Sequence, residues 1–98
     1  MAQPIYKAYT VNMSEAWYQL SKEEQDSLLA KVVEALDKAG GEIVILCNSA
    51  WSSEEAMFFG VEKFPDIEAV QKHTELLSEL NWLRYTNSKS VLGTEWSD

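Results

Sequence analysis

The feature that most constrains the fold is the placement of apolar residues along three short segments, each of which is apolar on both faces. Residues 42–48 contain the unbroken apolar run Ile43–Cys47, which is too short for a stable helix and is typical of a strand buried on both sides. Residues 5–13 alternate as a strand does, but both alternating sets contain large apolar or aromatic side chains. Residues 56–64 form a third strand with Met57, Phe58, Phe59 and Val61 on both sides. A sheet built from these strands needs a cover on each face.

Two further segments have the periodicity of amphipathic helices. The first begins after Ser21, which forms a capping box with Glu24, and it ends at Gly40-Gly41, where glycine permits a left-handed residue. The second opens with Pro65 or Asp66 at its first positions and runs to Leu80. The apolar sides comprise Leu28, Leu29, Val32, Val33, Ala35, Leu36 and Ala39 in the first helix and Ile67, Ala69, Val70, His73, Thr74, Leu76, Leu77 and Leu80 in the second.

The remaining segments complete the order of elements. Residues 14–20 predict a short helical turn, residues 49–55 a polar hairpin connection, and residues 83–90 a last strand followed by a tail around Gly93. The order is strand, helix, strand, strand, helix, strand. With right-handed crossovers it gives an α+β, ferredoxin-like βαββαβ fold, in which two helices cover one face of a four-stranded antiparallel sheet. We expect a single domain over residues 1–98, and we expect a second copy of the chain to cover the open sheet face.

From Ile5 to about Val91, this order, length and burial pattern resembles the dimeric α+β barrel superfamily, as a member of uncharacterised function. The resemblance implies a homodimer in which two sheets pack face to face. It also implies a range of functions, because the superfamily includes cofactor-independent monooxygenases, haem-degrading monooxygenases, muconolactone isomerase and chlorite dismutase. Residues 58–66 look distinctive, as a short family signature would, but no activity attaches to them.

The composition excludes several classes of partner. A formal net charge of −8 opposes binding to nucleic acid, and no apolar run approaches the roughly 18–20 residues that cross a bilayer, so a membrane partner is not expected. The start of the chain has neither a basic nor an apolar leader segment, and Cys47 is the lone cysteine. These features predict an acidic, cytoplasmic protein.

His73 is the candidate catalytic residue, because a titratable ring on the apolar side of a helix needs a partner or a pocket. The main alternative is a structural histidine, hydrogen-bonded at the boundary of helix and sheet or in the dimer interface. A third possibility comes from the resemblance, since some haem-degrading relatives ligate iron through a histidine on this helix. Those relatives pair it with a helical tryptophan about three turns upstream, and here that stretch is a strand. Cys47, in a buried run, is expected to be inert.

Aromatic side chains are the candidate lining of a ligand pocket. Such residues suit a flat, apolar molecule, but they serve equally well as the core of a dimer. Asn12, Asn48 and Asn87 are the candidate orienting groups, and Arg84 could bind a carboxylate or pair with a surface acid. The candidate lining residues are Tyr6, Tyr9, Trp51, Phe58 and Tyr85, with Phe59 and Trp82 as further members.

No motif indicates a cofactor or metal site. The chain lacks a P-loop and a dinucleotide fingerprint, and one histidine and one cysteine far apart make no zinc spacing. The sequence therefore leaves two functions open. One is a homodimer that binds a small apolar or aromatic molecule, as a cofactor-free monooxygenase or isomerase with His73 as acid/base and tyrosines as hydrogen-bond donors. The other is a non-enzymatic stress-related or accessory dimer with a packed interior.

Overall fold

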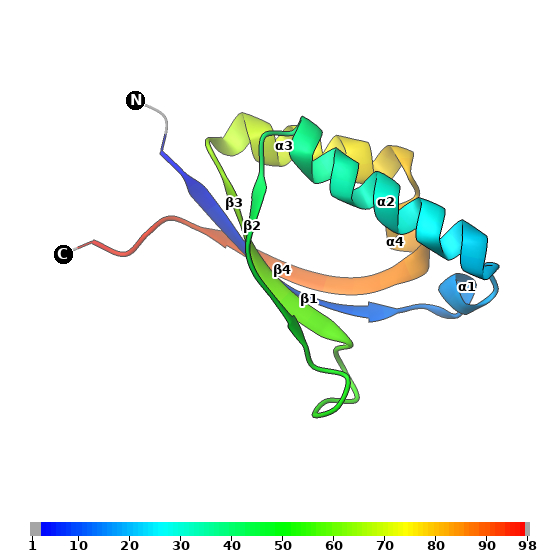
Figure 1. Ribbon diagram of the computed structural model, residues 1–98. Coiled ribbons are helices and arrows are strands. Elements are labelled where there is room, and N and C mark those ends of the chain that lie inside the picture. The colour runs from blue at the N-terminus through cyan, green and yellow to red at the C-terminus, as the bar shows by residue number, and fades with distance from the viewer. Residues whose placement is uncertain (1–2, 98) are drawn as a thin grey trace.

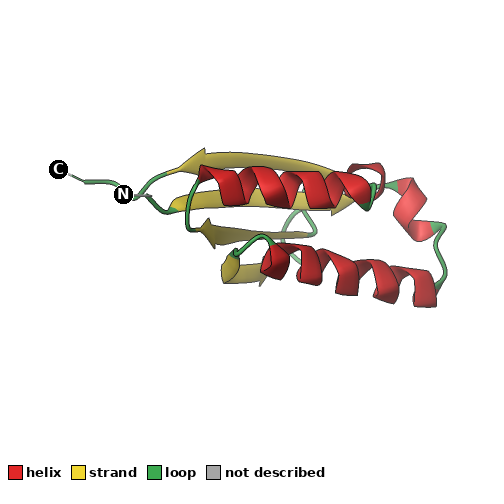
Figure 2. Ribbon diagram, turned by 90° about the horizontal axis from the view of Figure 1, so that it is seen from above, coloured by secondary structure: helices red, strands yellow, loops and turns green. Residues whose placement is uncertain are grey.

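The chain forms a four-stranded sheet and two main helices. A computed structural model describes residues 3–97. Figure 1 shows helices α2 and α3 on one side of the sheet, and Figure 2 shows that they lie side by side across it. The elements are β1 (Ile5–Met13), α1 (Glu15–Tyr18), α2 (Lys22–Lys38), β2 (Glu42–Asn48), β3 (Phe58–Phe64), α3 (Ile67–Glu79), α4 (Trp82–Tyr85) and β4 (Thr86–Gly93).

The sheet has the strand order β2-β3-β1-β4, and its neighbouring strands are antiparallel. This is the ferredoxin-like βαββαβ topology, so the predicted fold class is confirmed. Central β1 pairs with β3 and β4, whereas β2 and β4 are the edge strands. One face of the sheet lies under the helices and the other is open (Figure 1).

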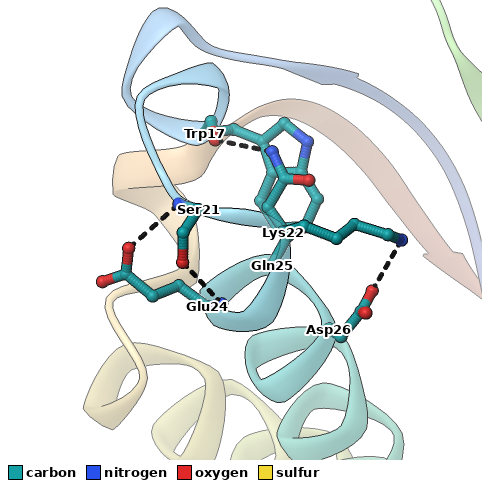
Figure 3. A network of polar contacts seen from close by, with 6 residues as sticks. All are labelled: Trp17, Ser21, Lys22, Glu24, Gln25 and Asp26. Carbon is teal, nitrogen blue, oxygen red and sulfur yellow. Dashed lines mark hydrogen bonds and ion pairs between the residues drawn. The ribbon is translucent and has the colours of Figure 1, made fainter.

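The start of α2 is fixed by local hydrogen bonds, as its sequence predicts. The Glu24 backbone N–H donates to Ser21 Oγ at 3.1 Å, and the Ser21 N–H donates to Glu24 Oε1 at 2.9 Å (Figure 3). Lys22 and Asp26 form an ion pair of 2.9 Å one turn further on, and Gln25 Nε2 donates to the Trp17 carbonyl, which ties the helix to α1. At the other end Gly40 has a φ of 83°, as expected of a helix-terminating glycine.

Two boundaries differ from the sequence prediction. Asp66 is the N-cap of α3, with Oδ1 accepting from the Ala69 N–H at 2.8 Å, so neither Pro65 nor Asp66 lies inside the helix. β3 begins at Phe58, two residues later than expected, because the residues before it belong to the β2–β3 connection.

The last strand also begins later than predicted. Residues 82–85 form the helical turn α4 and β4 starts at Thr86. Two interactions favour the turn: Thr86 Oγ1 donates to the Trp82 carbonyl at 3.1 Å, and the Trp82 ring packs edge-on against Trp17 with centroids 6.4 Å apart. Residues 82–85 are too few for their apolar pattern to distinguish a helical turn from a strand, so tertiary packing decides.

Two apolar clusters lie between the helices and the sheet. The larger is built on Val11, Met13, Trp17 and Trp82, and the smaller on Leu36, Phe64, Ala69 and Val70 with Ile5 against them. On the helix side of the sheet, the end of β1 at Val11 and Met13 belongs to the larger cluster, and its other end, at Ile5, belongs to the smaller one. In β3, Phe58 packs on the larger cluster and Phe64 on the smaller. The residues between these clusters form the candidate site.

The expectation that β2 is buried on both faces is wrong for the single chain. Val44 and Ile45 are each 53% exposed. The reason is that β2 is an edge strand with a bulge between Ile43 and Ile45. The open face carries an apolar patch of exposed or half-buried side chains, namely Ala8, Ile45, Cys47, Phe59, Val61 and Val91. Lys89 lies on the same face opposite Thr10, and Lys63 lies there opposite Tyr6.

Residues 3–97 contain neither a membrane-spanning helix nor a metal-binding cluster. None of the described helices is long and apolar enough to cross a membrane. In the same residues, no group of three or more His, Cys, Asp or Glu side chains is arranged to hold a metal ion.

Candidate functional site

A polar row interrupts the core between the two apolar clusters. Ile5, Tyr9, Val11 and Met13 of β1 pack on the helix side, so the alternation of the strand places Lys7 on that side too. Glu62 of β3 lies opposite Lys7 in the register, between inward-facing Phe58 and Phe64. Both charged residues are half-buried. A half-buried cation and acid cost folding free energy unless they are paired or hydrogen-bonded, because burial disfavours the charged forms.

His73 reaches the site from α3. Its side chain is only 2% exposed, and its ring lies 5.3 Å from that of Phe64. Within residues 3–97, Nδ1 of this ring is buried and has no hydrogen-bond partner. Burial, and secondarily the charge of Lys7, lowers the pKa of His73 to about 4, so the imidazole is neutral at pH 7. A buried ring nitrogen without a partner is uncommon and needs an explanation.

Tyr9 lies beside this row on β1. The residue opposite it is Gly60, and a Cβ atom added there would lie 2.8 Å from the Tyr9 hydroxyl. The phenol therefore occupies the space above Gly60 that a side chain would fill. Burial, followed by repulsion from Glu62, raises the pKa of Tyr9 to about 12, so the hydroxyl remains a proton donor.

Glu62 is the acidic member of the row. Burial raises the pKa of its carboxyl, and the positive charge of Lys7 partly offsets the effect. The ion pairs described for residues 3–97 are both i,i+4 pairs exposed on α2, so neither Lys7 nor Glu62 has a direct ion-pair partner there. The site thus brings together an acid, a cation, a phenol and a neutral imidazole, from three elements.

The candidate residues that the sequence suggests do not all lie together in the structure. His73, Tyr9 and Phe58 lie on the helix side of the sheet, and Tyr85 of α4 packs on the same cluster as Tyr9 and Phe58. The rings of Tyr9 and Phe58 meet edge-on with centroids 6.5 Å apart. Tyr6 lies on the opposite, open face, where Lys63 Nζ sits 5.8 Å from its ring centroid. Trp51 is 83% exposed in the β2–β3 connection, apart from the others.

The polar candidates serve local structure. Asn12 Oδ1 accepts from the Met13 N–H and Asn48 Oδ1 accepts from the Ala50 N–H, so both side chains stabilise nearby backbone. Asn87 is exposed on β4. Cys47 is half-buried on the open face, which corrects the expectation of a buried thiol; the cause is again the edge position of β2.

Two hollows in the surface lie away from His73. One, of about 460 Å³, runs between α2 and α3 and includes Leu28, Leu80 and Tyr85 in its lining. The other, of about 490 Å³, lies on the open face and includes Tyr6, Val61 and Val91. Tyr85 and Tyr6 therefore border different hollows. His73 lines neither of them; its ring is closed off from solvent while its Nδ1 stays unpaired.

Lys7 and Glu62 are the site residues that sequence reasoning missed. Each is a charged residue within the otherwise apolar inward set of its strand, between Ile5 and Tyr9 in β1 and between Phe58 and Phe64 in β3. This interruption is a usable signal, but it appears only once it is known which alternating set faces the helices.

The protonation state of His73 can be followed by NMR without assigning the histidine signals to residues, because the chain has one histidine. We expect its ring Cε1–H signal in NMR to titrate with a midpoint near pH 4. Because the unfolded chain, with a pKa near 6.5, binds the proton more readily, the free energy of unfolding should fall as pH falls from about 6.5 to about 4, by roughly 2–3 kcal/mol. A midpoint near 6.5 would show that the ring is solvated or hydrogen-bonded in its charged form.

Comparison with solved structures finds the same fold in other proteins, which bears out the resemblance of this fold to that of the dimeric α+β barrels. The chain matches, over residues 5–97, the model of a family of unknown function, DUF6616, and it belongs to that family. The sequence matches none of the curated proteins with which it was compared.

Three solved structures illustrate the likeness. A protein provisionally assigned as a chlorite dismutase is 19% identical, with a TM-score of 0.72 over 96% of this chain and 46% of that protein, so this chain spans about half its length. A Rhodopseudomonas palustris protein of unknown function is 12% identical, with a TM-score of 0.71 over 100% of this chain and 86% of that one. SnoaB, a cofactor-independent oxygenase from Streptomyces nogalater, is 15% identical, with a TM-score of 0.54 over 97% of this chain and 93% of SnoaB. At these identities the likeness establishes the fold alone.

Proposed function

We propose that the protein is a homodimer that binds a small, largely apolar ring molecule between the sheet and α3, as a cofactor-free enzyme of the oxygenase or isomerase type. The observation that carries this proposal is His73, whose buried Nδ1 has no hydrogen-bond partner within residues 3–97 and whose ring lies near the half-buried Lys7 of the polar row. Perturbed titratable groups gathered in one place are typical of functional sites.

The apolar character of the ligand follows from the surroundings of the row. Tyr9 and Phe58 form an edge-on aromatic pair beside Val11 and Met13, and Tyr85 packs on the same cluster. Aromatic walls with a few polar groups suit a ring that carries one or two oxygen substituents. Movement of α3 or its side chains would be needed to admit the ligand, since His73 is closed off in this structure.

The open sheet face supports the homodimer. Its apolar members lie on all four strands, and Val91 is 67% exposed. An apolar face of this kind marks an interaction surface. A second copy is the occupant we propose, because the fold resembles that of the dimeric α+β barrel superfamily and the same patch on two copies can pack isologously.

Ligand binding is tested with 2-tetralone, an apolar ring ketone, by saturation-transfer NMR. We expect the wild-type protein to bind it and the His73→Leu variant to bind at least about tenfold more weakly, since a ligand hydrogen bond to the ring nitrogen is lost. The same variant should be more stable than wild type by about 1 kcal/mol, because it removes a buried unpaired nitrogen.

The alternative is an accessory dimer with a packed interior, and the closed position of His73 against Phe64 favours it. In that case wild type and variant should both fail to bind the probe. A loss of more than about 1 kcal/mol in His73→Leu would further show that the ring makes a stabilising hydrogen bond in solution. The two outcomes together separate a ligand site from a structural histidine.

A further inference from the structure

We propose that Glu62, and not His73, is the proton-transfer group of this site, and that its substrate is an apolar ring compound with an enolisable carbonyl. The inference rests on the proposed function, because it assumes that a ring molecule enters between the sheet and α3. It assigns the chemistry to a residue that the sequence pattern did not single out.

The first argument is the position of Glu62. It lies on the inward face of β3 with Lys7 opposite it on β1, and Gly60, two residues before it on the same face, leaves its space to the Tyr9 phenol. The charged and titratable groups near Glu62 are Lys7, opposite it on β1, and Tyr9, on which its charge acts. His73 of α3 lies near Lys7. The β4 residues on this face, Ser88, Ser90 and Leu92, carry no charge.

The second argument is the unsuitability of His73. The low basicity of His73 in the folded chain makes it a weak proton acceptor at neutral pH. Burial raises the pKa of the Glu62 carboxyl, so its carboxylate is a stronger base than that of an exposed glutamate. The unpaired Nδ1 of His73 can instead accept a hydrogen bond from a hydroxyl or enol of the ligand and fix its orientation. His73 is then a positioning residue.

The proposed reaction is a proton transfer that needs no oxidant or cofactor. The Glu62 carboxylate takes a proton from the carbon next to the ring carbonyl, so the C–H bond breaks and a carboxyl O–H bond forms. The electron pair of the C–H bond becomes the enolate, whose oxygen carries the negative charge. The Lys7 ammonium and the Tyr9 hydroxyl stabilise that charge. Return of the proton from Glu62 to the same or another carbon gives the ketone or its isomer.

The test uses 2-tetralone in D₂O and follows, by NMR, the exchange of its α-protons for deuterium. We expect wild-type protein to accelerate exchange at least about 100-fold over buffer. The Glu62→Gln variant should bind the probe and lose the acceleration, and Lys7→Met should lower it at least about tenfold through loss of charge stabilisation. Glu75→Gln, an exposed acid on α3 two residues from His73, is the matched control and should exchange as wild type does.

The outcomes distinguish this inference from the proposed function. If Glu62→Gln binds 2-tetralone and exchanges it at the wild-type rate, the assignment of Glu62 is overturned while the ligand site stands. If exchange is lost in His73→Gln and kept in Glu62→Gln, the proton transfer belongs to His73. If wild-type protein shows no saturation transfer to the probe, both the ligand site and the assignment fail. Should Glu62→Gln not fold, as judged by circular dichroism, Lys7→Met decides: exchange at the wild-type rate overturns the proposal.

Discussion

Replacing Val61 with glutamate is expected to convert the proposed dimer into monomers. Val61 lies on the open face of β3, opposite Ala8 of β1 and Ile45 of β2, so it is at the centre of the apolar patch. In a face-to-face dimer the new carboxylate would be buried without a partner, which costs several kcal/mol. We expect the dissociation constant to rise at least about 100-fold. Sedimentation velocity at micromolar concentration measures it.

Two control variants make this result specific. Val61→Ile keeps the patch apolar and should leave the dimer intact. Ala30→Glu places the same charge on the exposed side of α2 and should also leave it intact. Val61 is already half-exposed in the single chain, so the fold of the monomer should survive the glutamate. A Val61→Glu protein that remains dimeric would place the interface elsewhere.

Replacing Phe64 with alanine is expected to cause the largest loss of stability. Phe64 is 0% exposed and is the centre of the smaller apolar cluster with Leu36, Ala69 and Val70. Truncation of such a ring leaves a cavity and costs about 3–5 kcal/mol of unfolding free energy, measured by urea denaturation. Trp51→Ala, at an 83% exposed position, is the control and should change stability by less than about 0.5 kcal/mol.

The same variant also reports on the site. The Phe64 ring lies 5.3 Å from that of His73 and closes it off from water. In Phe64→Ala the histidine should titrate at a higher pH than in wild type, towards 6.5, because solvation of the ring lowers the cost of its charge. A loss below about 1 kcal/mol with an unchanged titration would contradict the packing described here.

The elements with local signals could be predicted closely. The capping box of Ser21 and Glu24 and the left-handed Gly40 give the start and end of α2, and the alternation of β1 gives its bounds. The sequence pattern misplaces the last strand because residues 82–85 are too few to show either a helix or a strand period. The turn is selected by the contact between Trp82 and Trp17, which lie far apart in the sequence.

The candidate site was predictable only in part. His73 stands out as the titratable residue on an apolar helix face. Lys7 and Glu62 do not stand out, because both sets of each strand contain large apolar residues and the inward set follows only from the pairing. Trp51 was grouped with the other aromatics by residue type, yet its indole N–H bonds to the Asn48 carbonyl in an exposed turn.

The two faces of the sheet carry different features. The open face carries the residues that a second chain would cover, and the helix face carries the titratable row. Variants on one face should therefore leave the function of the other largely intact, provided that the dimer is not required to shape the site. Val61→Glu and Glu62→Gln, at adjacent residues on opposite faces, are the sharpest pair for testing this separation.

Native mass spectrometry of freshly purified protein tests the central claim most directly, because one spectrum reports both subunit number and retained ligand. We expect a species at twice the 11.1 kDa mass of the chain, with an additional small mass from a bound organic molecule. A spectrum of monomers without an adduct would contradict both the dimer and the ligand site.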